Sequence, residues 1–171
     1  MAAPASSGPD ARSPFATVSQ IGLLGLWLGA AAFLATVVAP AAFDVLPSRE
    51  LAGALVGRTL PALFMAGAVV GLVALAIEVV AAPRPYRLGR IVATCVTALA
   101  CAIAQLGVAP RIAALRANLS VPLASLPADD PLRVAFGRLH MLSVAWLAAA
   151  ILAAGVAIAL AVLTLRRRYP R

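Results

Sequence analysis

The sequence predicts an all-α membrane protein, a four-transmembrane-helix bundle with amphipathic outer segments. Of its 171 residues, 63% are hydrophobic and 12% are charged, whereas soluble domains are about half apolar and about a quarter charged. Four runs with little or no charge are each long enough for a helix of about 20 residues, which crosses a hydrocarbon layer of about 30 Å. Four such spans with short connections leave no room for a separate soluble domain.

The chain opens with a polar segment and a first apolar run. Residues 1–17 are rich in Ala, Ser, Pro and Gly, which predicts a disordered N-terminal tail. No charge occurs from Phe15 to Phe43, and this run exceeds the apolar core of about 7–15 residues found in secretory signals. We therefore expect a retained first span over residues 18–39, with cleavage near Ala41 as the alternative. Pro40 predicts an end or a kink in this helix.

A short outer connection precedes the second span. Pro47 and Ser48 predict the start of a short amphipathic helix that ends near Arg58 and lies on the membrane surface or at the top of the bundle. The second span is expected over residues 61–80.

The third span is expected over residues 91–109 and is interrupted only by Gln105. Beyond Pro110, apolar residues recur at helical spacing between arginines, which predicts that this helix continues past the membrane as an amphipathic extension. A loop should then reach Asp130.

The fourth helix has a clear start and a clear end. Asp130 supplies an N-cap oxygen, and Pro131 fits the first helical turn because the missing N–H is not needed there. The span itself covers residues 141–165 and ends at three consecutive arginines. Residues 18–168 thus form one transmembrane domain, followed by a short tail of residues 169–171.

Arginine placement sets the predicted topology. All 14 basic residues are arginines, and with both termini inside, the inner side carries more of them than the outer side, so both termini should be cytoplasmic. Because no basic stripe is interleaved with aromatic residues, nucleic-acid binding is not expected. The inner arginines should instead contact anionic lipids; they are Arg84, Arg87, Arg90, Arg166, Arg167 and Arg168.

Four polar residues should converge at the outer side, Asp44, Gln105, Arg111 and His140. Together with Ser143, which like Gln105 could orient His140 or bind a polar solute, they are the candidates for an outward-facing pocket for a small solute or ion. His140 is the only histidine and could handle protons near neutral pH or ligate haem or copper. The plainer alternative is a satisfied hydrogen-bond cluster between helices, worth about 1 kcal/mol in a membrane.

Other reactive residues form no evident site. Cys95 and Cys101 lie six residues apart, so on a helix their side chains point about 120° apart and do not bridge easily. No set of three or four metal ligands is evident, so no metal site is predicted. Ser143 shares a helix with His140 and has no oxyanion device, so no catalytic residues are predicted. The protein is therefore expected not to be an enzyme, with a redox enzyme as the alternative.

Glu78 lies close to the inner end of the second span. An acid in a span is a candidate for proton or cation handling. Because Glu78 is within about one turn of the interface and near Arg84, a structural ion pair or a carboxylate that reaches the headgroups is the alternative.

Glycines at small-xxx-small spacing occur in the first two spans. Gly25 with Gly29, and Gly67 with Gly71, allow another backbone to approach closely. They could pack within the monomer, or they could hold a homo-oligomer or another membrane protein.

The chain resembles the bacterial four-span membrane proteins of unknown function related to transmembrane protein 205. The resemblance rests on short motifs spread over most of the chain: Trp27, Gly29, Phe33, Ala39, Pro40, Phe43, Ala52, Gly53, Gly57, Phe64, Gln105, Pro110, Phe136, Leu139, His140 and Ser143. It implies a four-helix protein of the bacterial inner membrane without an established activity. More distantly, the architecture resembles copper-resistance membrane domains and haem-associated membrane protoporphyrinogen oxidases, which suggest His140 as a ligand. The second histidine of such sites is missing here.

Overall fold

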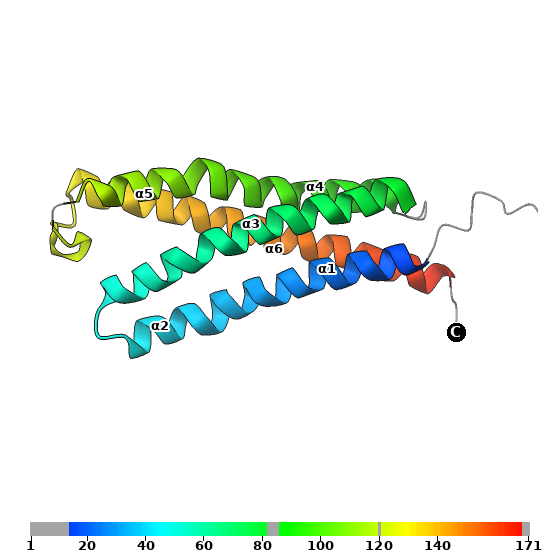
Figure 1. Cartoon of the computed structure of the whole chain (residues 1–171), viewed down its shortest axis with the longest axis horizontal. Helices are drawn as coiled ribbons and strands as arrows, with labels where there is room; N and C mark the ends of the chain where they lie inside the picture. The colour runs from blue at the N-terminus through cyan, green and yellow to red at the C-terminus, as the bar shows by residue number, and fades with distance from the viewer. Residues whose placement is uncertain (1–13, 82–85, 120, 169–171) are drawn as a thin grey trace, which may run out of the picture.

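The structure is an antiparallel bundle of four long helical segments. The computed structural model describes residues 14–81, 86–119 and 121–168. In order, the elements are α1 (Pro14–Phe33), η1 (Leu34–Val38), α2 (Ala39–Val45), α3 (Arg49–Ala81), α4 (Arg87–Ile103), η2 (Ala104–Val108), α5 (Ala109–Ala117), η3 (Leu123–Ser125) and α6 (Pro131–Arg168). Figure 1 shows that α1 begins and α6 ends at the same end of the bundle, here called the termini end; the opposite end is the loop end.

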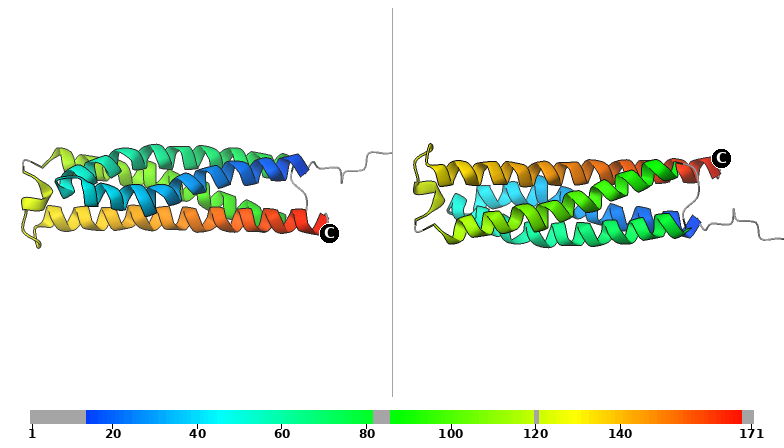
Figure 2. Two further views of the ribbon diagram at one scale, coloured as in Figure 1. Left: turned by 90° about the horizontal axis from the view of Figure 1, so that it is seen from below. Right: turned by 90° about the horizontal axis from the view of Figure 1, so that it is seen from above.

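The four segments form a closed ring. The first segment packs against α3 and α6, and α4 packs against the same two helices, so α1 and α4 face each other across the bundle. Figure 2 shows from two sides that all four segments run along the same long axis. Each segment is apolar and long enough to cross a membrane, with lengths of 32, 33, 31 and 37 residues. The fold is thus the predicted all-α four-helix bundle.

Three of the segments pass a proline without breaking, and two of them do so after a π-helical stretch. In each of these two, the tripeptide Val-Ala-Pro begins at the last residue of a five-residue π-helical stretch, η1 before Pro40 and η2 before Pro110. The N–H of Ala39 bonds to the carbonyl of Leu34, and the N–H of Ala109 bonds to that of Ala104. A wider turn before each proline absorbs the missing N–H and the ring clash. The first helix therefore continues to Val45 instead of ending near residue 39.

The predicted short helix before the second span begins where expected, but it does not end near Arg58. Ser48 accepts a hydrogen bond from the N–H of Leu51 at 3.2 Å, as an N-cap does. From there α3 continues through Pro61 to Ala81 as one helix of 33 residues. The outer amphipathic segment is therefore an extension of the span along the bundle axis.

The start of the fourth helix is confirmed. Asp130 Oδ1 accepts a hydrogen bond from the N–H of Leu132 at 2.8 Å. The helix of 38 residues is about 57 Å long at 1.5 Å per residue, well beyond a hydrocarbon layer of about 30 Å. Part of the bundle therefore extends past the apolar layer. Residues 1–13 and 169–171 lie outside the described residues, and α1 already begins at Pro14.

At the centre of the bundle, Trp27 and two glycines of α3 allow the helices to pack closely. The Trp27 indole, 3% exposed, donates to the carbonyl of Leu63 at 3.0 Å. A Cβ added at Gly67 would lie 2.6 Å from the indole and 2.6 Å from Cys101 Sγ, and one at Gly71 would lie 2.8 Å from the Cβ of Ala98. These two glycines therefore pack within the monomer.

Candidate functional site

Buried polar side chains from all four helices gather in the half of the bundle nearer the termini end. None is more than 1% exposed. We call this group the buried polar cluster; its members are Thr17, Gln20, Glu78, Arg90, Thr94, Thr97 and Thr164. In an apolar bundle, such groups are costly unless they are hydrogen-bonded or occupied by a ligand.

Arg90 is the centre of the cluster. Its Nη2 and Nε donate to the same oxygen of Glu78, Oε1, at 2.7 and 3.2 Å, and its Nη1 donates to Thr164 Oγ1 at 3.0 Å. The guanidinium thus joins α4 to α3 and to α6. The ion pair is fully buried, and its opposite charges compensate each other, so the pair places no net charge in the apolar interior.

The first helix completes the cluster. Gln20 Nε2 donates to Thr94 Oγ1 at 3.5 Å, across the diagonal of the ring from α1 to α4. Thr17 lies one helical turn before Gln20, and Thr94 lies one turn after Arg90, so the contacts from α1 adjoin the ion pair.

Three oxygens of this cluster have no hydrogen-bond partner among the described residues. They are Thr17 Oγ1, Gln20 Oε1 and Glu78 Oε2, all inaccessible to solvent. A buried polar atom left without a partner costs about 1–3 kcal/mol. The amide and carboxylate oxygens can only accept, and the hydroxyl can accept or donate. A group that donates hydrogen bonds would therefore satisfy these oxygens.

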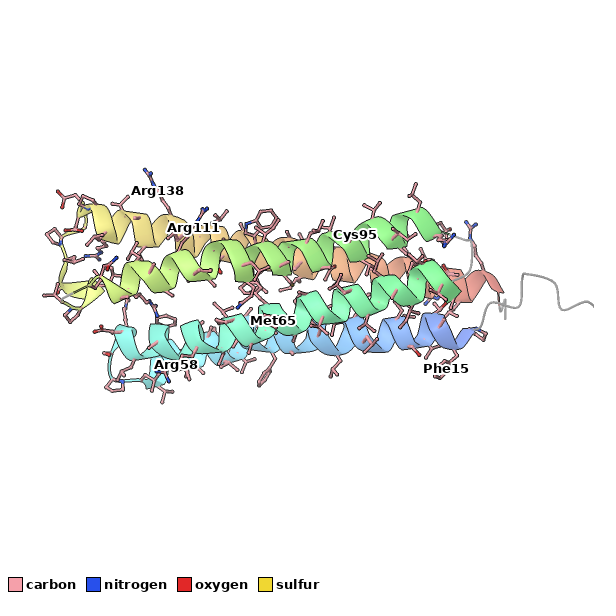
Figure 3. All side chains as sticks on the ribbon, turned by 45° about the horizontal axis from the view of Figure 1, so that its top comes forward. Phe15, Arg58, Met65, Cys95, Arg111 and Arg138 are labelled. Atoms are coloured by element: carbon pink, nitrogen blue, oxygen red, sulfur yellow. The ribbon has the colours of Figure 1, made fainter. Side chains whose placement is uncertain are left out.

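The outer residues of the predicted pocket are placed differently. Asp44, Arg111 and His140 are exposed, Gln105 is half-buried, and Ser143 is 6% exposed. Figure 3 shows Arg111 and Arg138 projecting away from the bundle. Gln105 lies in η2, and its Oε1 is buried without a partner among the described residues.

His140 belongs to an aromatic contact at the loop end. Its ring stacks on Phe136, with centroids 6.1 Å apart, and the Arg116 guanidinium lies over the same phenyl ring at 5.2 Å. Arg116 Nη2 also donates to the carbonyl of Gly53 at 3.5 Å. The same guanidinium lies against Gly57, where an added Cβ would be 3.0 Å from Nη1. Within the described ranges, no three His, Cys, Asp or Glu side chains group closely enough to hold a metal ion.

Among the arginines at the termini end, Arg87 and Arg167 contact groups near the helix ends, whereas Arg90 is buried inside the bundle. Arg87 donates to the carbonyl of Val79 at 2.8 Å near the end of α3, and Arg167 lies over the Tyr86 ring at 4.8 Å. The expectation that Arg90 contacts lipid headgroups is wrong, because its side chain is fully buried. Arg84, the predicted partner of Glu78, and the side chain of Arg168 lie outside the described residues; Glu78 pairs with Arg90.

The pairing of Glu78 with Arg90 carries a signal in the sequence. Both lie six positions from residue 84, in the short connection between α3 and α4. Residues equally far from the turn of a helical hairpin lie at the same height, so an acid and a base so placed can meet. Gln20, Thr94 and Thr164 carry no such signal, because their meeting depends on how α1 and α6 are rotated.

These observations define the class of protein: a four-helix membrane protein with a buried charged cluster. A family model described as "Domain of unknown function (DUF4149)" matches residues 22–120, more than half of the chain, and the chain belongs to this family. The matched range contains Glu78, Arg90 and Thr94. Searches of curated proteins and of solved structures gave no match.

Proposed function

We propose that this protein is a non-enzymatic membrane protein that binds or passes a small polar solute in the buried polar cluster. The observation that supports it is the set of three buried oxygens that have no partner among the described residues; two are on α1, and the third belongs to the carboxylate of the compensated ion pair. A donor bound there would remove a penalty that the protein otherwise bears.

The cluster supports this function better than the predicted outer pocket does. Arg111, His140 and Asp44 are exposed to the surroundings of the bundle, where the solvent can satisfy them. In the cluster, by contrast, polar atoms are held in an apolar interior, and this arrangement is typical of substrate and ion pathways in membrane proteins.

Charge favours an uncharged solute over a cation. Glu78 is already compensated by Arg90, so a cation would have to be buried beside a guanidinium without a free counter-charge. We accordingly propose that the protein works without haem, copper or another resident cofactor. We further propose an inner-membrane location with the termini end in the cytoplasm, and kinship with the proteins related to transmembrane protein 205.

The test is a panel of small polar solutes applied to the full chain in detergent: urea, glycerol, ammonium, guanidinium, sodium and potassium. Thermal unfolding is followed for the wild type, for the double variant Thr17→Val/Gln20→Leu, and for the matched control Thr36→Val. Thr36 lies on the same segment, is exposed and bonds only its own helix, at Ala32. The proposal expects an uncharged solute to stabilise the wild type and the control but not the double variant. Equal responses in all three proteins would refute it.

A scaffold role is the second candidate, and one observation favours it. Gly25 and Gly29 have no atom of the described residues within 4 Å of an added Cβ, so their small-xxx-small surface is open. Such a surface suits a second copy or another membrane protein. Replacing both glycines with Leu should then lower the oligomer size measured in mild detergent; an unchanged size would rule this role out.

A further inference from the structure

A surface groove lies directly behind the buried polar cluster. It has a volume of about 380 Å³ and runs between α1 and α3 at the termini end, within the range of about 300–1,000 Å³ typical of small-molecule sites. Its lining is almost entirely apolar: Phe15, Ala16, Ser19, Ala76, Ile77, Val80 and Ala81. Figure 3 marks this region by Phe15 near the start of α1.

The groove and the unpartnered oxygens share the same helical turns. Ala16 precedes Thr17, Ser19 precedes Gln20, and Ile77 precedes Glu78. In each pair, the first residue lines the groove and the second carries an oxygen without a partner among the described residues. The three buried acceptors therefore lie on the same turns of α1 and α3 as the groove, and their side chains point away from its lining.

From this juxtaposition we propose that the ligand is a membrane-soluble amphiphile with an apolar chain and an uncharged hydroxyl head. The chain lies in the groove between α1 and α3, and the hydroxyl donates to the acceptors of the buried polar cluster. This inference rests on the proposed function: the hydroxyl head is the small uncharged donor that the buried polar cluster is proposed to bind, and the apolar chain attached to it occupies the groove.

Each part of the ligand follows from a part of the site. The groove lies on spans that face lipid, and its apolar lining excludes a polar chain. The acceptors require a donor, and the compensated charge of Glu78 and Arg90 disfavours a charged head. Of the four spans, the one containing α1 is the least buried, so the groove beside it is open to the lipid side of the bundle.

The test uses two diazirine-labelled probes with the same hexadecyl chain, one an alcohol and the other its methyl ether, with the full chain in phosphatidylcholine nanodiscs. After illumination, labelled peptides are quantified. The alcohol should label the segments 15–19 and 76–81 about fivefold more than the ether, the ratio expected for one hydrogen bond in a membrane. Equal labelling would mean ordinary acyl-chain contact and would overturn the inference.

Substitutions in the groove test whether the apolar chain of the ligand binds there. Ile77→Trp should fill the groove and abolish the alcohol labelling, and Ala76→Phe serves as a milder substitution with the same aim. Val73→Trp is the matched control, because Val73 is exposed on the same helix and lines no part of the groove. If Ile77→Trp and Ala76→Phe fold and label like the control, the groove is not the site.

The outcome also separates this inference from the proposed function. A small-solute response that depends on Thr17 and Gln20, together with equal labelling by both probes, would remove the amphiphile and keep the solute site. If neither the small-solute response nor the alcohol preference is observed, the proposed function and this inference are both refuted. An alcohol preference that disappears in Thr17→Val/Gln20→Leu but not in Thr36→Val supports the two together.

Discussion

Removing one partner of the buried ion pair should strongly destabilise the bundle. Both hydrogen bonds that described residues donate to Glu78 come from Arg90, so Arg90→Leu leaves a buried carboxylate without a donor. Breaking a buried pair in this way costs about 3–5 kcal/mol. The same range applies to Glu78→Leu, which removes the carboxylate that pairs with the buried guanidinium. The double variant buries no charge, so its loss should be smaller than that of either single variant.

This double-mutant cycle can be measured by reversible unfolding in mixed micelles of dodecyl sulfate and dodecyl maltoside, followed by helicity. The coupling energy, defined as the loss of the double variant minus the sum of the single losses, should be negative and exceed about 2 kcal/mol in size. Arg111→Leu is the control, because an exposed substitution changes stability by no more than about 0.5 kcal/mol. Additive losses would refute the account of Arg90 as the centre of the cluster.

Three further predictions concern packing and capping, with unfolding free energy in the same micelles as the measurement. Gly67→Ala should lose about 1–3 kcal/mol, because its Cβ would meet Trp27 at 2.6 Å; wild-type stability would contradict this packing. Gly25→Ala should leave stability unchanged or raise it by up to about 1 kcal/mol, since no atom of the described residues lies within 4 Å of the added Cβ and Ala favours helix. Asp130→Ala should lose about 1 kcal/mol with its cap to Leu132, and Asp130→Asn should not.

The fold could be predicted from the sequence because its signals are local. Hydropathy alone locates four spans, and the caps at Ser48 and Asp130 depend on side chains next to the helix start. The continuity of the helices was harder to predict. Pro40 reads as an end or a kink, but the π-helical turn of η1 lets the chain pass it, and such turns depend on packing against neighbouring helices.

The candidate site was only partly predictable, for a geometric reason. Glu78 stands out as an acid in a span, but Arg90 reads as one of several loop arginines beside the membrane. Its burial follows from the rotation of α4, which turns the first helical turn towards α3 and α6. Gln20 and Thr164 are common polar residues in helices, and only the assembled ring brings them to the same level.

The outer residues, in contrast, were predicted as a site, but the structure leaves most of them exposed. His140 and Arg111 attract attention by residue type, since each sits at the boundary of an apolar run. The structure leaves both exposed, and Phe136 rather than Gln105 or Ser143 contacts the imidazole. Residue type and depth thus suggested a site there, but among the described residues three of the four buried oxygens without a partner lie on α1 and α3 in the half nearer the termini end, and only Gln105 Oε1 belongs to the predicted pocket.

The most direct measurement of the central claim is native mass spectrometry of the full chain released from nanodiscs. The wild type and Thr36→Val should each retain a bound non-protein molecule, because the cluster presents acceptors that no described residue satisfies. Thr17→Val/Gln20→Leu should lose that molecule while remaining folded. Identical spectra for the three proteins would contradict the assignment of the buried polar cluster as a ligand site.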